Sequence, residues 1–215
     1  MNKILSVTGI SKKAENVYWL ADKQKSPLAF SFSQVVTTIA LPNQQPDPFV
    51  SVVVMEFKHY PAIQDGLVAK TVAGGFSLTP QNLEKAKGNT IIQDSERYGS
   101  VPAHVSVSKK STYQWRIFVD QPCSMNADVS YNFQGKSKNG TIIIRCAGKS
   151  VQSELKPTGQ TVGEPRSDWQ INSFKSHRIG TLLFPSPGFY DVEMEIVPGK
   201  NEDVGFQWLW LGRLK

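Results

Sequence analysis

Residues 178–211 alternate apolar and polar side chains between proline and glycine breaks, and this stretch limits the possible folds most strongly. Apolar or alternating runs cover 178–184, 189–197 and 206–211. Period-two alternation between such breaks is typical of antiparallel strands that place one face on a core. The stretch therefore predicts successive strands of an all-β chain. The last run is apolar at both parities, so it should be a central strand or one covered on both faces.

A second copy of this design lies upstream. Tyr113–Val119 forms an alternating run, Pro122 breaks it, and Ala127–Phe133 alternates again. The two copies suggest two strand pairs of one β-sandwich. We expect the following side chains to be buried together in its core: Trp115, Val192, Met194, Trp208 and Trp210.

Composition narrows the class of protein. The chain has 215 residues, of which 40% are hydrophobic and 20% charged, as in ordinary globular domains. Its net charge is +6, but the basic residues are scattered, so a nucleic-acid interface is not expected. No run approaches the ~18 apolar residues of a membrane span. The cysteines Cys123 and Cys146 match no zinc motif, and their spacing leaves a disulfide open.

Short strand-like runs separated by polar and proline-rich segments fill residues 1–61, and a linker at 61–66 predicts a domain boundary. Several short sequence motifs of this segment resemble the end of the β-sandwich that follows the catalytic barrel in family 29 α-L-fucosidases. Those motifs are Asn16–Leu20, Pro27–Phe30, Thr38–Pro42, Pro46–Pro48 and Val52–Phe57. The resemblance implies that this sandwich lacks its first strands here.

Residues 62–215 resemble a galactose-binding-like jelly-roll module found after the catalytic domain of Bacteroidetes-type fucosidases. The motifs that carry the resemblance are Gly75–Leu78, Trp115–Val119, Asp128–Tyr131, Thr158-Gly159, Asp168-Trp169, Gly180–Leu182 and Pro187–Val192. In that module a Trp follows the Thr-Gly pair closely, whereas here residues 160–166 intervene.

Two local signals predict structure inside this second domain. Thr79–Ala86 is the one segment with a helix start, since Thr79 can cap it and Pro80 suits the first helical position. Asn139-Gly140 lies between two strand-like runs, 131–133 and 141–145, and such a pair is typical of a two-residue hairpin turn.

The sequence offers no catalytic constellation. Glycosidases commonly use two carboxylates, and the dense acidic stretch is Asp191, Glu193 and Glu195. These residues share one parity of a strand, so a solvated outer face explains them better than catalysis does. The histidines lie far apart and near no nucleophile motif. In family 29 the catalytic residues belong to the barrel, so the resemblance implies none here.

Sugar binding needs an aromatic face with polar groups beside it. Trp169 stands beside Arg166 and Asp168 in a polar loop stretch, and Tyr98 stands in another. We take these four residues as the candidate carbohydrate site. The alternative for Trp169 is a core position at the end of the sandwich, with Arg166 and Asp168 paired on the surface.

The resemblances imply a function. Residues 1–61 would be the end of a barrel-associated sandwich, and 62–215 a galactose-binding-like accessory module. The chain would be a non-catalytic part of a secreted or periplasmic α-L-fucosidase, whose export signal lies outside it. Its own barrel and fucosylated glycans would be its partners, with no nucleic acid, no membrane span and no cofactor, while Ca²⁺ is left open. The alternative is a free-standing carbohydrate-binding or adhesion protein.

Overall fold

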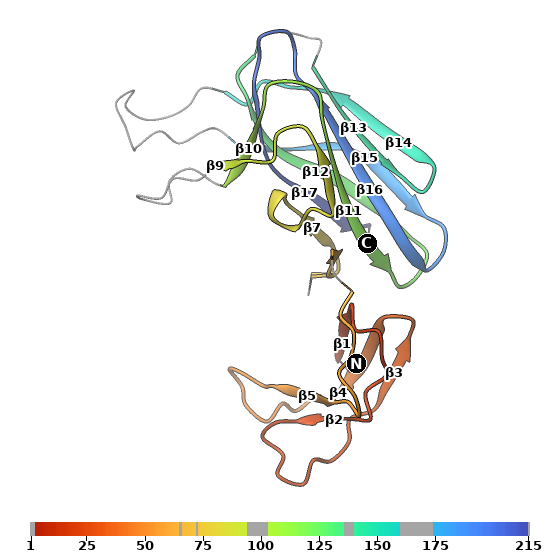
Figure 1. The fold of residues 1–215 in the computed structure, drawn as a ribbon. Helices are drawn as coiled ribbons and strands as arrows, with labels where there is room; N and C mark the ends of the chain where they lie inside the picture. Colours follow the sequence, from red (N-terminus) through yellow and green to blue (C-terminus); the bar gives the residue numbers. More distant parts are fainter. Residues whose placement is uncertain are drawn as a thin grey trace. The chain divides into compact units, whose positions relative to one another are not determined.

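The computed structural model describes residues 3–64, 66–71, 73–93, 103–135, 140–159 and 174–214. The chain divides into two compact units, Met1–Asp65 and Gly66–Lys215, each with its own sheets. Strands dominate the described residues, with one 3₁₀ turn and no α-helix among them (Figure 1). The predicted all-β class is confirmed, and no helix in this described part is long and apolar enough to cross a membrane.

The first unit is small. Its two sheets have the orders β1-β4-β3 and β2-β5. Its strands are β1 (Lys3–Thr8), β2 (Asn16–Trp19), β3 (Phe30–Ser33), β4 (Val36–Leu41) and β5 (Val53–Glu56). Between them lies a short core of apolar residues: Ala14, Val17, Trp19, Leu28 and Ile39. The predicted short strands of this segment are present.

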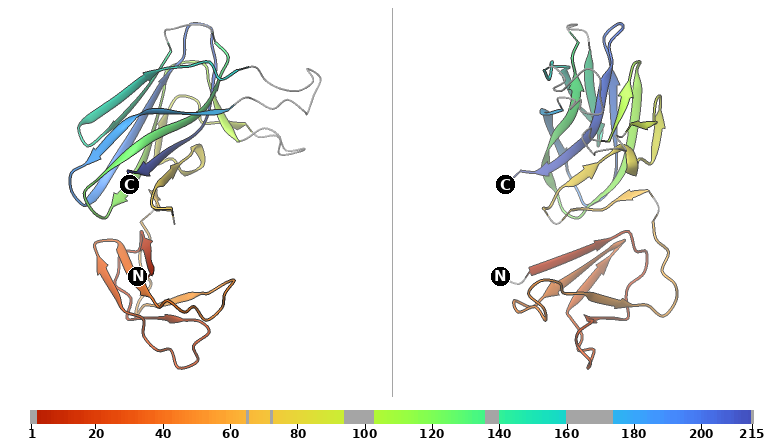
Figure 2. Two further views of the ribbon diagram at one scale, coloured as in Figure 1. Left: turned by 180° about the vertical axis from the view of Figure 1, so that it is seen from behind. Right: turned by 90° about the vertical axis from the view of Figure 1, so that its left-hand side faces the viewer.

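The second unit is a β-sandwich whose two sheets lie as two layers around one core (Figures 1 and 2). We name each sheet after a central strand. The β17 sheet has the order β15-β12-β17-β10-β9, with β7 also on β17, and the β16 sheet has the order β14-β13-β16-β11-β6, with β8 also on β11.

The strands of the β17 sheet are β7 (Phe76–Leu78), β9 (Ile92–Gln93), β10 (His104–Val107), β12 (Cys123–Phe133), β15 (Lys175–Phe184) and β17 (Val204–Arg213). Those of the β16 sheet are β6 (Leu67–Val68), β8 (Lys85–Lys87), β11 (Ser111–Val119), β13 (Thr141–Cys146), β14 (Lys149–Glu154) and β16 (Gly188–Val197).

The two copies of the strand–corner–strand design pair with each other, and each sheet contains one of the resulting strand pairs. In each copy the corner carries the chain from one sheet to the other, so β11 and β12 belong to different sheets, as do β15 and β16. β11 then pairs with β16, and β12 with β15, both antiparallel. The predicted sandwich is present, but the two strands of each copy lie in different sheets and are not partners.

Aromatic rings fill the middle of the core. Trp115 is fully buried, and its indole nitrogen Nε1 donates to the carbonyl oxygen of Thr79 at 2.9 Å. Phe206 from the opposite sheet packs edge-on against Trp115, with 6.1 Å between ring centroids, and stacks on Tyr113 at 5.5 Å. Val192 and Met194 are also fully buried there, as predicted.

Strand β17 changes its buried face in mid-course. Opposite β12, Ser130 pairs with Trp208 but the next residue, Tyr131, pairs with Phe206, so Gln207 is an extra residue in β17. A one-residue bulge moves every following side chain to the opposite face. On the other edge of β17 the bulge falls between the short partners β10 and β7.

The bulge overturns the predicted position of two tryptophans. Val204 and Phe206 point into the core before it, whereas Leu209 and Leu211 do so after it. Trp208 and Trp210 are therefore only partly buried and do not belong to the core cluster. The prediction that both lie with Trp115 in the core is wrong. The predicted central place of the last strand is confirmed.

The predicted helix over Thr79–Ala86 is wrong as well. It is a 3₁₀ turn, Pro80–Asn82, followed by β8. The side chain of Asn82 accepts from the backbone N–H of Thr79 at 2.8 Å and donates to the carbonyl of Ser77, which closes the turn. The chain then continues as a strand because β11 offers it a backbone partner.

The predicted Asn139-Gly140 hairpin is wrong too, because the strands on either side belong to different sheets. At the end of β12 the backbone N–H of Phe133 donates to Thr158 Oγ1 at 3.0 Å. After it the chain crosses to β13, where the carbonyl of Gly140 accepts from Leu155 N–H. Asn139 itself lies outside the described residues.

The two cysteines are free thiols on different sheets. Burial raises the pKa of the Cys146 thiol to about 12, whereas Cys123 is half-buried. The Cys146 thiol is therefore protonated at pH 8, and its burial also keeps a reagent from reaching it. We therefore expect a chromogenic disulfide reagent to titrate one thiol per native chain and two after unfolding in guanidinium. Two fast thiols in the native chain, or none after unfolding without reductant, would contradict this.

Candidate functional site

The predicted carbohydrate residues fall in two segments that the structure does not describe. Tyr98 lies in 94–102, and Arg166, Asp168 and Trp169 lie in 160–173. Their placement as a sugar site therefore stays a prediction. The candidate sites that follow are built from the described residues alone.

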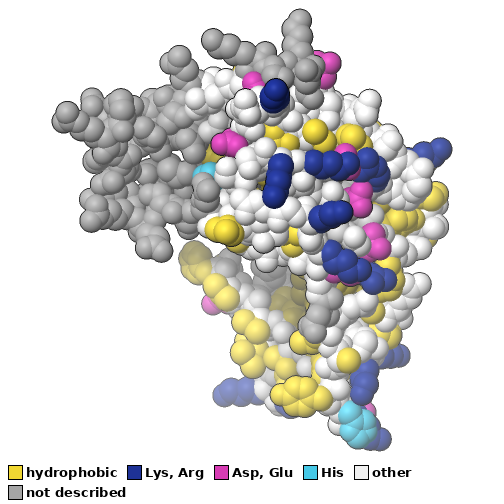
Figure 3. Space-filling model, turned by 45° about the horizontal axis from the view of Figure 1, so that its top comes forward, with side chains coloured by type: hydrophobic (Ala, Val, Ile, Leu, Met, Phe, Trp, Pro, Cys, Tyr) yellow, Lys and Arg dark blue, Asp and Glu magenta, His cyan; other side chains and the backbone are white. Residues whose placement is uncertain are grey.

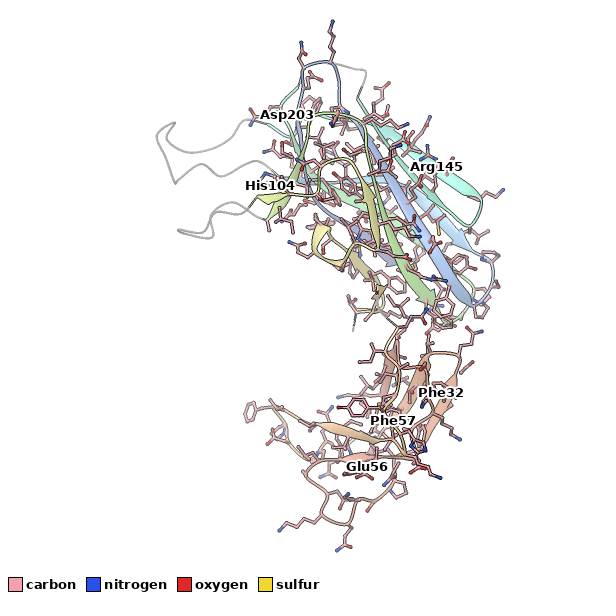
Figure 4. The ribbon with its side chains drawn as sticks, viewed as in Figure 1. Phe32, Glu56, Phe57, His104, Arg145 and Asp203 are labelled. Carbon is pink, nitrogen blue, oxygen red and sulfur yellow. The ribbon has the colours of Figure 1, made fainter. Side chains whose placement is uncertain are left out.

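The described residues beside these segments form a polar hollow at one end of the second unit. Phe174 packs on the ring of His104, with 5.2 Å between centroids. His104 lines a hollow of about 420 Å³ together with Asn132, Glu202 and Asp203. Figure 4 shows His104 and Asp203 on the same side of this unit. Among the described residues no group of three or more His, Cys, Asp or Glu could hold a metal ion.

Trp208 and Trp210 provide an aromatic surface on the outer face of the β17 sheet. Both lie after the bulge, on the side of the strand opposite Leu209 and Leu211. Residues two apart on one strand face are about 6.5–7 Å apart along the strand. Both indoles are half-buried and so keep part of their surface in solvent. We call this surface the tryptophan face.

Two glycines shape the seat of Trp210. A side chain at Gly75 would begin 2.5 Å from the Cζ2 atom of the indole, and one at Gly212 would begin 2.6 Å from its Nε1. Contacts this short cannot be accommodated without moving the ring. The indole therefore occupies space that the two neighbouring backbones leave open.

Polar groups flank the tryptophan face on β12 and β15. Asp128, the register partner of Trp210, accepts two hydrogen bonds from Arg178, at 2.8 and 3.0 Å. Ser130, the partner of Trp208, donates to the side-chain oxygen of Gln207 at 2.7 Å. The Arg178 side chain is 57% exposed, so its remaining N–H groups face solvent. Aromatic surface and hydrogen-bonding groups thus occur together on one sheet face.

Sequence reasoning missed this face because it placed both tryptophans in the core. The alternation of Phe206, Trp208 and Trp210 is uninterrupted in the sequence, and nothing there marks Gln207 as a bulge. One signal was present: Leu209 and Leu211 are equally apolar at the other parity. Either set could have been the buried one.

The acidic strand face on β16 is only partly the solvated surface predicted. The Asp191 side chain is 57% exposed and that of Glu193 is 40%, but Glu195 is 11% exposed. One guanidinium nitrogen of Arg145 bridges Glu193 at 2.9 Å and Glu195 at 3.3 Å, and Lys110 approaches Glu195 at 3.1 Å. Both glutamates are therefore held by cations, an arrangement that suits a paired surface rather than an acid and base flanking a sugar.

Comparison with known proteins gives structural likeness alone. No family model and no curated protein matches the chain. Its structure is similar to the insecticidal crystal protein Cry2Aa, with a TM-score of 0.51 and 12% identity over 93% of this chain and 32% of that one. This likeness agrees with the β-sandwich fold.

Two other solved structures are more weakly similar. An α-L-fucosidase from Vibrio sp. strain EJY3 has a TM-score of 0.48 and 19% identity, over 97% of this chain and 35% of that one. The C-terminal CBM6 of the Zobellia galactanivorans laminarinase LamC has a TM-score of 0.47 and 10% identity, over 64% of this chain and 98% of that one. The chain thus spans about a third of the length of Cry2Aa and of the fucosidase.

Proposed function

We propose that this chain is a non-catalytic carbohydrate-binding β-sandwich that accompanies a glycoside hydrolase domain. The observation that carries the proposal is the tryptophan face, where two indoles stand outside the core beside hydrogen-bonding side chains. Trp208 and Trp210 leave apolar ring surface in water that the core does not use. An apolar ligand face would cover it, and the neighbouring polar groups would serve hydroxyls.

Sugar rings match this combination because they carry an apolar face of C–H groups and a rim of hydroxyls. An indole can stack on the first. Arg178 can donate to hydroxyls, and Asp128 has oxygens that can accept from them. The shape of the face favours an extended chain of sugars lying along β17, since the two indoles follow one another along the strand.

The finer proposal concerns the parent protein. The sequence resemblances support an α-L-fucosidase, with residues 1–61 as the end of its barrel-associated sandwich and 62–215 as its accessory module. Its barrel and fucosylated glycans would then be the partners, and the location would be secreted or periplasmic. Arg166, Asp168, Trp169 and Tyr98 would add contacts from the loops.

Titration of the 215-residue chain with fucosylated and unbranched neutral oligosaccharides tests the proposal. We expect Trp208→Ala with Trp210→Ala to weaken binding at least about tenfold, which corresponds to about 1.4 kcal/mol. Both indoles lie outside the core cluster and are only partly buried, so we expect each substitution to cost less than a core truncation, about 1–2 kcal/mol of unfolding free energy. The double variant should therefore remain folded, which circular dichroism checks.

Trp169→Ala is the matched control, because it removes an indole from the predicted loop site instead. Loss of binding in Trp169→Ala with full binding in the double variant would move the site to the loops. Absence of binding by the unchanged chain to every neutral glycan tested would refute the tryptophan face as a carbohydrate site. Hydrolysis of an aryl fucoside by the isolated chain would refute the non-catalytic assignment.

A further inference from the structure

A groove crosses the outer face of the β16 sheet, on the opposite layer from the tryptophan face. It consists of two adjoining hollows of about 590 and 500 Å³ that share Gln114 and Glu193 in their linings. The first hollow lies beside Lys85, Lys87 and Lys110, and the second continues toward Arg145. We call the whole surface the basic groove and define it by these six residues.

The strand registers fix the order of side chains along the groove. Lys85 on β8 pairs with Gln114 on β11, which pairs with Glu193 on β16, which pairs with Arg145 on β13. Neighbouring strands lie about 4.7–4.9 Å apart, so this row spans about 14–15 Å. A basic, an amide, an acidic and a second basic side chain follow one another along this row. Its length leaves room for more than one sugar ring.

The charges of the groove are unequal along its length. Arg145 and Lys110 neutralise Glu193 and Glu195 on the floor. Lys85 and Lys87 are exposed at one wall, and no carboxylate of a described residue lies within salt-bridge distance of either. Figure 3 shows Lys and Arg side chains gathered around acidic ones on this part of the surface. Two ammonium groups are therefore left for an anionic ligand.

Edge protection could explain these lysines without any ligand. β8 is a short edge strand, and lysine on such strands hinders pairing with another chain. That explanation does not require the hollow next to them, nor the place of Gln114 in the lining of both hollows. Lys110 comes from a turn outside the strand and extends the basic wall.

We propose that the basic groove binds an anionic polysaccharide, with the acidic group of a sugar at Lys85 and Lys87 and hydroxyls at Gln114 and Glu193. The carboxylates on the floor distinguish this ligand from nucleic acid. They already pair with Arg145 and Lys110, so of the four cations that define the groove only Lys85 and Lys87 have no carboxylate partner among the described residues. A continuous phosphate backbone needs cations along its whole length, whereas a sugar chain also presents hydroxyls from which Glu193 can accept. The site is separate from the tryptophan face, so each can be tested with the other intact.

The test compares binding of the 215-residue chain to dextran sulfate, polygalacturonate, unmodified dextran and single-stranded DNA of similar length. We expect affinity for dextran sulfate or polygalacturonate and none for dextran in this groove. Binding of dextran sulfate alone would identify a sulfate as the recognised group, and binding of polygalacturonate alone would identify a carboxylate. Lys85→Gln with Lys87→Gln should weaken that binding about tenfold and lower the slope of log affinity against log salt by about two, one per lysine removed.

Lys23→Gln with Lys58→Gln is the matched control, because it removes the same charge from exposed lysines of the first unit. A tenfold loss in the groove variant with little change in the control supports the proposal. Equal losses in both pairs would reduce the effect to net charge and overturn it. It would be overturned equally by DNA binding as tight as the polysaccharide and equally dependent on Lys85 and Lys87. Trp208→Ala with Trp210→Ala should leave this binding unchanged.

Discussion

Trp115→Ala should lower the free energy of unfolding of the second unit by about 3–5 kcal/mol, the range for truncating large buried aromatic residues. Trp115 is fully buried between the sheets and contacts Phe206 across the core. The truncation removes that contact, leaves a cavity in a close-packed interior and deprives the carbonyl of Thr79 of its indole donor. Urea denaturation followed by near-ultraviolet circular dichroism measures the loss.

Trp115→Phe is the control that separates packing from hydrogen bonding. It keeps an aromatic ring in the core but loses the Nε1–H donor, so we expect a smaller loss of about 1–3 kcal/mol. A loss below about 1 kcal/mol for Trp115→Ala would mean that the ring does not lie in the core. The first unit has its own core, and its unfolding transition should stay unchanged in both variants.

Deletion of Gln207 should destabilise the second unit by about 3–6 kcal/mol. Without the extra residue β17 can keep only one parity, so either Val204 and Phe206 or Leu209 and Leu211 must turn outward. All four are fully buried, and burying one such side chain is worth about 1.5–3 kcal/mol. Two of them are lost in either register. Denaturant titration of the deletion variant measures the sum.

Gln207→Ala is the matched control, because it keeps the residue count and removes only the side chain. It loses the hydrogen bond from Ser130, which we expect to cost about 1 kcal/mol. A deletion no worse than this substitution would contradict a structural role for the bulge. If the deletion instead stays folded and buries Trp208 and Trp210, indole fluorescence should shift to the blue.

Alternation predicted the buried face correctly wherever a strand keeps its register. In β11 and β16 the inward set includes Trp115, Val192 and Met194, as expected. These strands pair with each other without interruption from Ser111 to Val119. In β17 the same rule failed at one residue, because a bulge is a property of the pairing with β12 and both parities of this strand are apolar.

Strand partners were harder to predict than strands. Asn139-Gly140 suits a tight turn, but local turn preference cannot tell whether the flanking strands share a sheet. That is decided by long-range contacts such as the hydrogen bond between Phe133 and Thr158. The helix predicted over Thr79–Ala86 does not form for the same reason. Part of this segment pairs with β11, and a backbone partner in the sheet outweighs a weak local helix propensity.

The candidate sites also depend on long-range strand pairing, which local sequence signals do not reveal. Sequence reasoning sought sugar binding in polar loops, at Arg166, Asp168, Trp169 and Tyr98. The tryptophan face became visible only after the register of β17 was known. The basic groove depends on registers across four strands, and Lys85 and Arg145 are 60 positions apart in the printed sequence. No local motif can link them.

The central place of β17 governs the order in which a ribosome-bound chain can fold. Ser130 and Gln207, neighbours in the finished sheet, are 77 residues apart, so synthesis at about 5–20 residues per second separates them by about 4–15 s. During that interval β7, β10 and β12 have left the ribosome with unpaired backbone edges, because the strand that joins them has not been made. The first unit pairs its strands within a short span and can fold ahead of them. We therefore expect the edges of β7, β10 and β12 to be the part of the second unit most open to pairing with other chains until β17 emerges.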